Sequence, residues 1–142
     1  VPHVVAVGSE ITLEHARIFG KSLREDTSLC EWVGHPEGVN INFIWRNPEG
    51  IAVRTFEVGV EDVTLSCGTG SAASAFVAAK VFGISLPVVT HSLGGSLKIT
   101  ETSGHLSIRG QTCYQGKVIG FVNGAYPKPI FPIDYRHHQH YW

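Results

Sequence analysis

The spacing of hydrophobic residues changes along the chain and predicts different elements in turn. Over residues 11–26, apolar positions recur every three or four residues between charged ones, which predicts an amphipathic surface helix. Over residues 39–45 they alternate, which predicts a strand with Asn40 and Asn42 on the face opposite the larger apolar side chains. A turn rich in Asn, Pro and Gly then joins this strand to a second one over residues 51–56, and the two strands are expected to form a hairpin.

Residues 71–82 differ from both patterns, because small and apolar residues occupy nearly every position and Lys80 is the one charge. A helix with this composition is predicted to be buried on every face. Gly83 is predicted to end it. The remaining strands are short and separated by turn residues. They are predicted at residues 4–7, 88–91, 97–102, 105–109 and 118–123, and the strand over residues 4–7 is expected to be buried.

These elements predict an α+β fold in which a curved, mostly antiparallel sheet wraps around one central buried helix. The chain shows no internal repeat or linker, so we expect one domain over residues 1–126 and a Pro/His-rich tail over residues 127–142. The tail contains His137-His138-Gln139-His140, for which a flexible terminus is a better interpretation than a metal site.

Composition narrows the class of protein. Of the 142 residues, 43% are hydrophobic and 16% are charged, a balance typical of a folded globular chain. The net charge of -1 provides no basic surface for nucleic acid or an anionic membrane. No apolar run approaches the roughly 20 residues that span a bilayer. The first residues also lack the features of a secretory signal.

The three cysteines, Cys30, Cys67 and Cys113, lie far apart in the sequence and form no Cys-x-x-Cys pair. This spacing argues against a zinc site or a disulfide framework, and free thiols fit a cytoplasmic protein. A cysteine is by default a small, buried, apolar residue. We interpret Cys30 and Cys113 in that way, and only Cys67 has neighbours that suggest chemistry.

Cys67 comes directly before Gly68-Thr69-Gly70 and the predicted buried helix. The first N–H groups of a helix have no internal partners and carry partial positive charge, which favours a thiolate near neutral pH. Because the glycines leave the backbone open, the amides of Gly68, Thr69 and Gly70 can close on a carboxylate. From these local features alone, a tight turn beside a core cysteine explains the sequence equally well.

Four segments taken together resemble the diaminopimelate epimerase family. The run from Arg54 to Ser71, which ends in Cys67-Gly68-Thr69-Gly70-Ser71, is similar to the family's second catalytic motif. Pro2-His3-Val4-Val5 resembles the strand that opens its second domain, and Gly38 to Phe43 resembles its Asn-Val-Asn-Phe strand. Leu93-Gly94-Gly95-Ser96-Leu97 resembles the turn after its central helix. Order and spacing agree over roughly residues 1 to 125.

The resemblance implies half of a cofactor-independent amino-acid epimerase, in which two similar domains face each other across the active site. One cysteine thiolate removes the α-proton and the thiol of the other domain returns a proton to the opposite face, without pyridoxal phosphate or metal. The implied partners are an amino-acid substrate and an N-terminal half that carries the second cysteine. The implied catalytic residues are Cys67 and His3, and the implied substrate-binding residues are Asn40, Glu57, Val58, Gly68 and Thr69.

Some of these candidates also have an ordinary structural interpretation. His3 is explained by a hydrogen-bonded histidine at the start of a strand, and Asn40 by an asparagine at a strand edge. Glu57, a charge within an apolar stretch, is explained by a structural ion pair. Each interpretation makes a different prediction about what the side chain contacts.

Three positions depart from the family pattern. Val58 stands where the family has the arginine that binds the distal carboxylate of diaminopimelate, and loss of such an ion pair costs about 2 kcal/mol or more. Val63 replaces a usual glutamate, and Val1 replaces an asparagine that contacts the substrate. These departures favour a substrate with a less charged side chain, or a copy that has lost activity.

The sequence therefore leaves three hypotheses. The first is an isomerase half that epimerises diaminopimelate, a precursor of lysine and peptidoglycan. The second is a racemase of a different amino acid, and the third is a non-catalytic module with the same fold. A homodimer that brings two copies of Cys67 together is an alternative to a separate N-terminal half.

Overall fold

A computed structural model describes residues 1–111, 119–121 and 127–129 of the chain. Its contacts divide the chain into two units, Val1–Arg109 and Gly110–Trp142. Cys113 and the tract His137–His140 lie outside the described residues. The candidate site lies wholly within the first unit.

The first unit contains three helices and seven strands among its described residues, and the second contributes a short strand pair. The helices are α1 (Leu13–Arg24), α2 (Thr27–Val33) and α3 (Gly68–Phe82). The strands are β1 (His3–Val7), β2 (Asn40–Asn47), β3 (Gly50–Glu57), β4 (Asp62–Val63), β5 (Val88–Ser92), β6 (Gly95–Thr102) and β7 (His105–Gly110). In the second unit, β8 (Ile119–Phe121) pairs with β9 (Pro127–Pro129).

The main sheet is mixed, with strand order β1-β2-β3-β5-β6-β7 and β4 attached to β3. The hairpins β2–β3 and β5–β6 are antiparallel, whereas β1 runs parallel to β2 and β3 runs parallel to β5. Each parallel pair requires a crossover connection between its strands, usually a helix. Helices α1 and α2 provide the first crossover and α3 provides the second.

The alternation predicted for β2 is present and gives the sheet two different faces. Ile41 of β2 and Phe56 of β3 lie opposite each other and pack with Ala16 of α1 and Cys30 of α2. Cys30 is 3% exposed, as expected for a cysteine that serves as a core residue. This cluster holds α1 and α2 on one face of the sheet.

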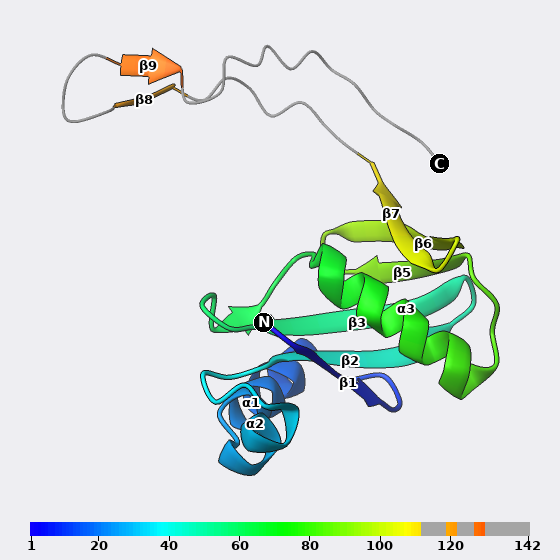
Figure 1. Cartoon of the computed structure of the whole chain (residues 1–142), viewed down its shortest axis with the longest axis horizontal. Coiled ribbons are helices and arrows are strands. Elements are labelled where there is room, and N and C mark those ends of the chain that lie inside the picture. Colours follow the sequence, from blue (N-terminus) through cyan, green and yellow to red (C-terminus); the bar gives the residue numbers. More distant parts are fainter. Residues whose placement is uncertain (112–118, 122–126, 130–142) are drawn as a thin grey trace. The chain divides into compact units, whose positions relative to one another are not determined.

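The other face carries α3. Ile44 of β2 and Val53 of β3 pack with Ala75 and Ala78 of the helix. Figure 1 shows α3 lying across the strands, and the N-terminus of the chain lies near the start of that helix. The small residues of α3 bring its backbone close to the strands, and this close packing positions its N-terminal turn over the sheet.

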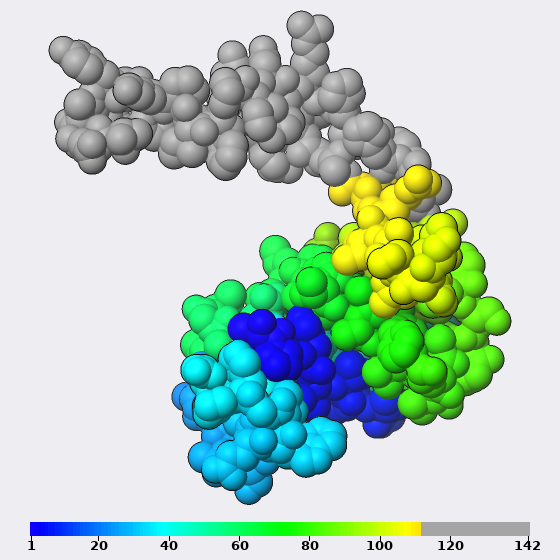
Figure 2. All heavy atoms as spheres, in the orientation of Figure 1, coloured from blue at the N-terminus to red at the C-terminus, as the bar shows by residue number. Residues whose placement is uncertain are grey.

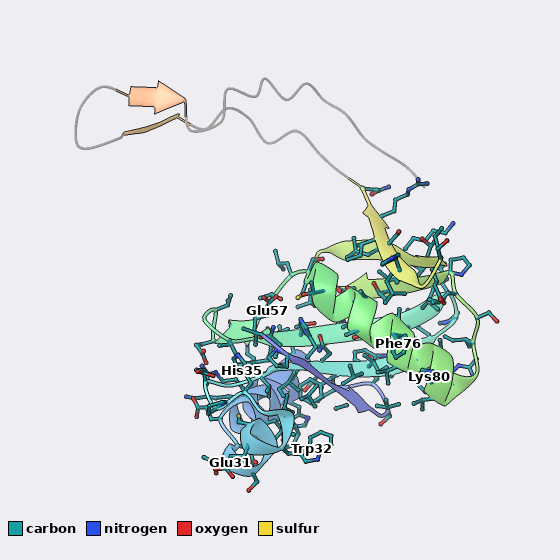
Figure 3. The ribbon with its side chains drawn as sticks, in the orientation of Figure 1. Glu31, Trp32, His35, Glu57, Phe76 and Lys80 are labelled. Atoms are coloured by element: carbon teal, nitrogen blue, oxygen red, sulfur yellow. The ribbon has the colours of Figure 1, made fainter. Side chains whose placement is uncertain are left out.

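The prediction that α3 is buried on every face is wrong for the described residues. Its sheet-facing side is buried at Gly70, Ser71, Ser74, Ala75 and Ala78. On the opposite side, Phe76 is 48% exposed and lies under the ammonium group of Lys80, 4.9 Å from the ring centre to Nζ. Figure 3 labels both residues on α3. The sheet lies against one side of α3 only, and sequence composition does not reveal which side is covered.

Two further predictions need correction. The expected helix over residues 11–26 ends at Arg24, because Asp26 takes an extended conformation and its carboxylate caps α2 by accepting from the N–H of Leu29 at 2.7 Å. The first strand was expected to be buried, but β1 is the edge strand of the sheet and is only half-buried. Its position at the edge brings His3 to the surface beside α3.

Candidate active site

The N-terminal turn of α3 lies against a patch of polar side chains from three neighbouring strands. His3 of β1 is the register partner of Asn40 of β2, and Asn42 lies opposite Thr55 of β3. Strand alternation points Asn40, Asn42 and Thr55 to the same face as α3, while their neighbours enter the α1 cluster. In Figure 2 the first residues of the chain, in blue, lie against the green segment that contains the start of α3. The polar patch and the helix start therefore form one site.

Cys67 is the N-cap residue of α3. Its backbone is extended (φ -135°, ψ 111°), and its sulfur accepts the N–H of Gly70 at 3.4 Å. Its carbonyl oxygen accepts the N–H of Ser71 at 2.8 Å, which starts the helix. The N–H groups of Gly68 and Thr69 belong to the first turn, where a helix offers them no internal partner. A partly exposed sulfur thus lies beside amides that favour negative charge.

Thr69 connects Cys67 with His3. Its Oγ1 lies 3.6 Å from the Cys67 sulfur and 3.0 Å from Nε2 of His3. The residues His3 and Thr69 are 66 positions apart in the sequence, so the contact exists only because β1 is placed beside the helix start. The histidine is hydrogen-bonded, and two of its partners, Thr69 and Asn40, are predicted site residues.

Asn42 and Thr55 complete this patch, and the sequence analysis singles out neither as a site residue. Asn42 donates from Nδ2 to the carbonyl of Val4 and lies with the same nitrogen 3.1 Å from Nδ1 of His3. Thr55 donates from Oγ1 to Oδ1 of Asn42 at 2.9 Å. Both side chains are buried, and Asn42 is fully enclosed. The signal that could have found them was the alternation itself, which places Asn42 on the same face as Asn40.

Asn40 and Glu57 lie at the edge of the patch. Asn40 accepts the N–H of Val58 through Oδ1 at 2.8 Å and points its Nδ2 towards His3. Glu57 lies at the end of β3 nearest the start of α3 (Figure 3) and accepts the hydroxyl of Thr64 at 2.6 Å. Among the described residues Glu57 forms no ion pair. The structural ion-pair interpretation of Glu57 therefore has no support in this part of the chain.

Burial lowers the pKa of His3 below its usual value of 6.5. The nearby carboxylate of Glu57 acts in the opposite direction, but the loss of solvent around the ring is the larger effect. His3 is therefore neutral at pH 7. A neutral imidazole can accept a proton at one nitrogen while it donates from the other.

The three valines that depart from the family pattern lie in different environments. Val58 is half-buried directly after Glu57, and only its backbone N–H is hydrogen-bonded to the site. Val63 is 8% exposed and belongs to the α1 cluster on the opposite face of the sheet. Val1 is 63% exposed. Of the three, Val58 and Val1 lie within two residues of Glu57 and His3 in the sequence, whereas Val63 packs in the core.

Two glycines fit closely around the site. A Cβ atom on Gly70 would lie 2.5 Å from Oδ1 of Asn42 and 3.2 Å from the sulfur of Cys67. A Cβ atom on Gly94 would lie 2.9 Å from Leu65, whose carbonyl accepts the Gly94 N–H at 2.7 Å. Gly94 therefore holds the segment that leads into Cys67. By contrast, a Cβ atom on Gly68 would make only an ordinary contact, 3.6 Å from Ile108.

Other features of the described residues lie away from this site. A surface hollow of about 770 Å³ is lined by Trp45, Arg54, Phe82 and neighbouring residues, at the end of α3 opposite Cys67. In the described part of the chain, no three His, Cys, Asp or Glu side chains come together as a metal site would require. None of the helices seen there has both the length and the apolar character of a membrane span.

The thiol, the histidine and the first-turn amides together form a site suited to acid–base chemistry next to a carboxylate. Comparisons with known proteins give the family of the chain. The family model described as diaminopimelate epimerase matches residues 1–118, and the chain belongs to that family.

Three curated relatives are 34–49% identical to this chain over the aligned residues. The diaminopimelate epimerase of Methanocella arvoryzae is 34% identical over 120 residues, which covers 83% of this chain and 41% of that protein. The one from Methanothrix thermoacetophila is 49% identical over 100 residues, covering 70% and 33%. The one from Chlamydia trachomatis serovar L2 is 36% identical over 115 residues, covering 78% and 40%. The chain thus spans less than half the length of these relatives.

Solved structures support the fold. A putative phenazine biosynthesis PhzC/PhzF protein from Clostridium difficile superposes with a TM-score of 0.58 at 13% identity, over 86% of this chain and 41% of that one. A PhzF family protein from Enterococcus faecalis gives a TM-score of 0.54 at 16% identity, over 71% and 34%. At such low identity the similarity concerns the fold alone.

Proposed function

We propose that this chain is one half of a cofactor-independent amino-acid epimerase and that Cys67 is one of its two thiol acid/base groups. The observation that carries the proposal is the position of the Cys67 sulfur. It lies at the N-cap of α3, 3.4 Å from the Gly70 N–H and 3.6 Å from a threonine hydroxyl that contacts a neutral histidine. These surroundings favour a thiolate and leave its outer side open to a substrate.

The proposed chemistry is a pair of proton transfers. The Cys67 thiolate takes the α-proton, so the C–H bond breaks, an S–H bond forms and the electron pair spreads into the substrate carboxylate. The N–H groups of Gly68 and Thr69 hold that carboxylate where negative charge develops. A second thiol on the opposite face then delivers its proton to the α-carbon, which inverts the configuration. His3, Asn40 and Glu57 surround the reacting group and bind or orient the substrate.

The second thiol must come from outside the described residues. Cys30 is buried in the α1 cluster on the opposite face of the sheet from Cys67. The relatives are more than twice as long as their matched regions, which leaves length for another half of similar size. We therefore propose an N-terminal half as the partner, with a homodimer as the alternative. Gel filtration of the chain as a monomer at all working concentrations would exclude the homodimer.

The substrate is proposed to be an α-amino acid, with diaminopimelate as the first candidate because the curated relatives are named for it. Val58 favours a second candidate, a racemase for an amino acid without a distal carboxylate. An arginine in this place would offer two parallel hydrogen bonds to such a carboxylate, and valine offers none. Only the choice of substrate distinguishes the two candidates.

The test is incorporation of deuterium from heavy water at the α-carbon. Diaminopimelate and a panel of neutral and acidic amino acids are incubated with the full chain and with the N-terminal half of the Methanocella arvoryzae relative as a second polypeptide. We expect exchange that disappears in Cys67→Ala and persists in the matched variant Cys30→Ala. The amino acid that exchanges fastest identifies the substrate. No exchange with any amino acid would favour a non-catalytic module.

A further inference from the structure

Asn42 is a fully buried side chain whose amide orientation is fixed by its partners. Its Nδ2 lies 3.1 Å from the backbone carbonyl oxygen of Val4, and its Oδ1 lies 2.9 Å from the hydroxyl of Thr55. A backbone carbonyl can only accept a hydrogen bond, so the atom facing Val4 must be the NH₂ group. The same NH₂ group faces Nδ1 of His3 at 3.1 Å.

This contact determines which nitrogen of His3 carries the proton. Because Nδ1 faces a donor, it is the acceptor of that hydrogen bond and bears no hydrogen. The neutral ring then keeps its single proton on Nε2. Nε2 lies 3.0 Å from Oγ1 of Thr69 and donates to it. The other tautomer would place the Nδ1–H against the Asn42 NH₂ group at 3.1 Å. In the favoured tautomer Nε2–H faces the Thr69 hydroxyl, which can accept, at 3.0 Å, and the Asn40 NH₂ group lies farther away at 3.5 Å.

The tautomer of His3 in turn sets the direction of the Thr69 hydroxyl. Once Oγ1 accepts from His3, its own proton is free to point at the Cys67 sulfur, 3.6 Å away. With the proton on Nδ1 instead, Nε2 would accept the Thr69 proton and turn it away from the sulfur. Two donors therefore reach the sulfur in the first arrangement, Thr69 and the Gly70 N–H, and one in the second.

We propose that Asn42 is a positioning residue that holds His3 in the Nε2–H tautomer, so that the Thr69 hydroxyl donates to Cys67 and stabilises its thiolate. The use of that thiolate as a catalytic base rests on the proposed function. The direction of the hydrogen bonds does not rest on it, because it follows from the donors and acceptors of the free chain. Asn42 acts through His3 and Thr69 and touches no substrate.

The direct test is the tautomer of His3 in the unmodified full chain. Histidine labelled with ¹⁵N and long-range ¹H–¹⁵N correlation spectra at pH 8 distinguish a protonated from an unprotonated ring nitrogen, and His3→Gln assigns the signal. We expect an unprotonated Nδ1 and a protonated Nε2. A protonated Nδ1 in the neutral ring would overturn the proposal without any need for a variant to fold.

Variants then test whether the tautomer of His3 affects the reactivity of the Cys67 sulfur. In Asn42→Leu we expect the single tautomer of His3 to be lost and alkylation of Cys67 by iodoacetamide at pH 7 to slow by roughly tenfold, the effect of losing one hydrogen bond to a charged group. Alkylation is read at the Cys67 peptide by mass spectrometry. Thr69→Val should slow alkylation to a similar degree and leave the His3 tautomer unchanged. Asn47→Asp, at the far end of the same strand, is the matched control and should change neither quantity.

These two measurements test the role of Asn42 independently of the proposed function. Neither measurement requires a substrate or a second half, so both can succeed even if no amino acid exchanges its α-proton. An unchanged tautomer in folded Asn42→Leu would overturn the role of Asn42 even in an active epimerase. Unchanged alkylation in Thr69→Val would overturn the last link, from the hydroxyl to the sulfur.

Discussion

The first turn of α3 leaves no room for a side chain at one of its two glycines. A Cβ atom at Gly70 would press against Oδ1 of Asn42, whereas Gly68 faces only an ordinary contact with Ile108. We expect Gly70→Ala to lower the free energy of unfolding by about 1–3 kcal/mol, because buried polar groups and the helix start must move apart. Gly68→Ala should change it by about 0.5 kcal/mol or less.

Urea denaturation of the two variants and the unmodified chain measures both values. The pair is matched, since each variant adds one methyl group within the same helical turn. An equal loss of stability in both would contradict the close packing of Gly70 against Asn42. Gly70→Ala should also slow alkylation of Cys67, because the added methyl group displaces the sulfur from its N–H donor.

His3 makes a predictable contribution to the dependence of stability on pH. Since its pKa is lowered in the folded chain, the unfolded chain takes up a proton at this residue before the folded chain does. Stability from this source is fully present above about pH 6.5, the pKa of an unfolded histidine, and is lost as the pH falls towards the lowered folded value. We expect the urea midpoint to fall less between pH 7.5 and pH 5 in His3→Gln than in the unmodified chain.

The control for this measurement is His15→Gln, which removes an exposed histidine from α1. Glu61 and Asp62 titrate at lower pH, because hydrogen bonds to the Gly59 amide and to Arg17 lower their respective pKa values. Working at pH 5 and above keeps both carboxylates charged. An identical fall of the midpoint with and without His3 would contradict the assignment.

The sequence predicted some of the site at this scale and not the rest. The motif identified Cys67, His3 and Thr69, and the structure brings these three side chains together. Asn42 and Thr55 were not singled out as site residues, because their importance lies in what they contact across strands rather than in a motif. Glu57 was recognised, but its partner Thr64 depends on the turn between β3 and β4.

At the scale of elements, helix α1 approaches the sheet closely at a single glycine. A Cβ atom on Gly20 would lie 2.6 Å from the side chain of Phe56. Alanine normally stabilises a helix by about 1 kcal/mol relative to glycine. We expect Gly20→Ala to have the opposite sign and to destabilise the chain by about 1–3 kcal/mol, because the helix must move away from the α1 cluster.

Ser22→Ala tests the same helix on its exposed side and should be neutral or slightly stabilising. Thermal denaturation of both variants compares the two effects directly. A higher melting temperature in Gly20→Ala would show that the contact between α1 and β3 is loose. We do not expect Gly20→Ala to alter the chemistry at Cys67, because Gly20 lies on the opposite face of the sheet.

The elements were predicted correctly where the hydrophobic pattern of the sequence agrees with the packing of the side chains. The alternation over residues 39–45 correctly separated the two faces of β2, and the Ser103-Gly104 turn has positive φ at both residues, as a tight hairpin requires. Helix α2 was missed because Asp26 continues the charged pattern of α1 while its side chain begins a new helix. The exposed side of α3 was missed because composition shows only that a helix is apolar.

At the scale of the whole molecule, several apolar side chains around the site are exposed to solvent. Leu65 is 68% exposed, Ile108 is 44% exposed and Leu93 is 42% exposed, and all lie on the segments around the start of α3. If an N-terminal half closes over Cys67, these side chains belong to the covered surface. We expect Leu65→Asp to weaken association with that half by roughly tenfold or more, as loss of a central apolar contact does.

Titration of the N-terminal half against the chain, followed by α-proton exchange, measures this association. Val81→Asp is the matched control, since Val81 is 58% exposed near the opposite end of α3. Association that weakens equally in both variants would place the contact surface elsewhere. The fold was predictable at this scale, but the covering surface was not, because a family motif identifies reacting residues rather than their surroundings.

The position of β1 has a consequence for how the reactive thiol arises during folding. The Gly70 N–H is local to Cys67 and can reach the sulfur as soon as α3 forms, but His3 must be brought to Thr69 from 66 residues away. Contacts of such long sequence separation are slow to form, and a parallel edge strand forms without the help of a hairpin. On a growing chain β1 is synthesised before α3, and it can complete the site only after α3 has been made. If His3 and Thr69 act on Cys67 as proposed, the activated sulfur is a property of the finished fold, and an unfinished chain exposes a thiol of more ordinary reactivity to oxidants.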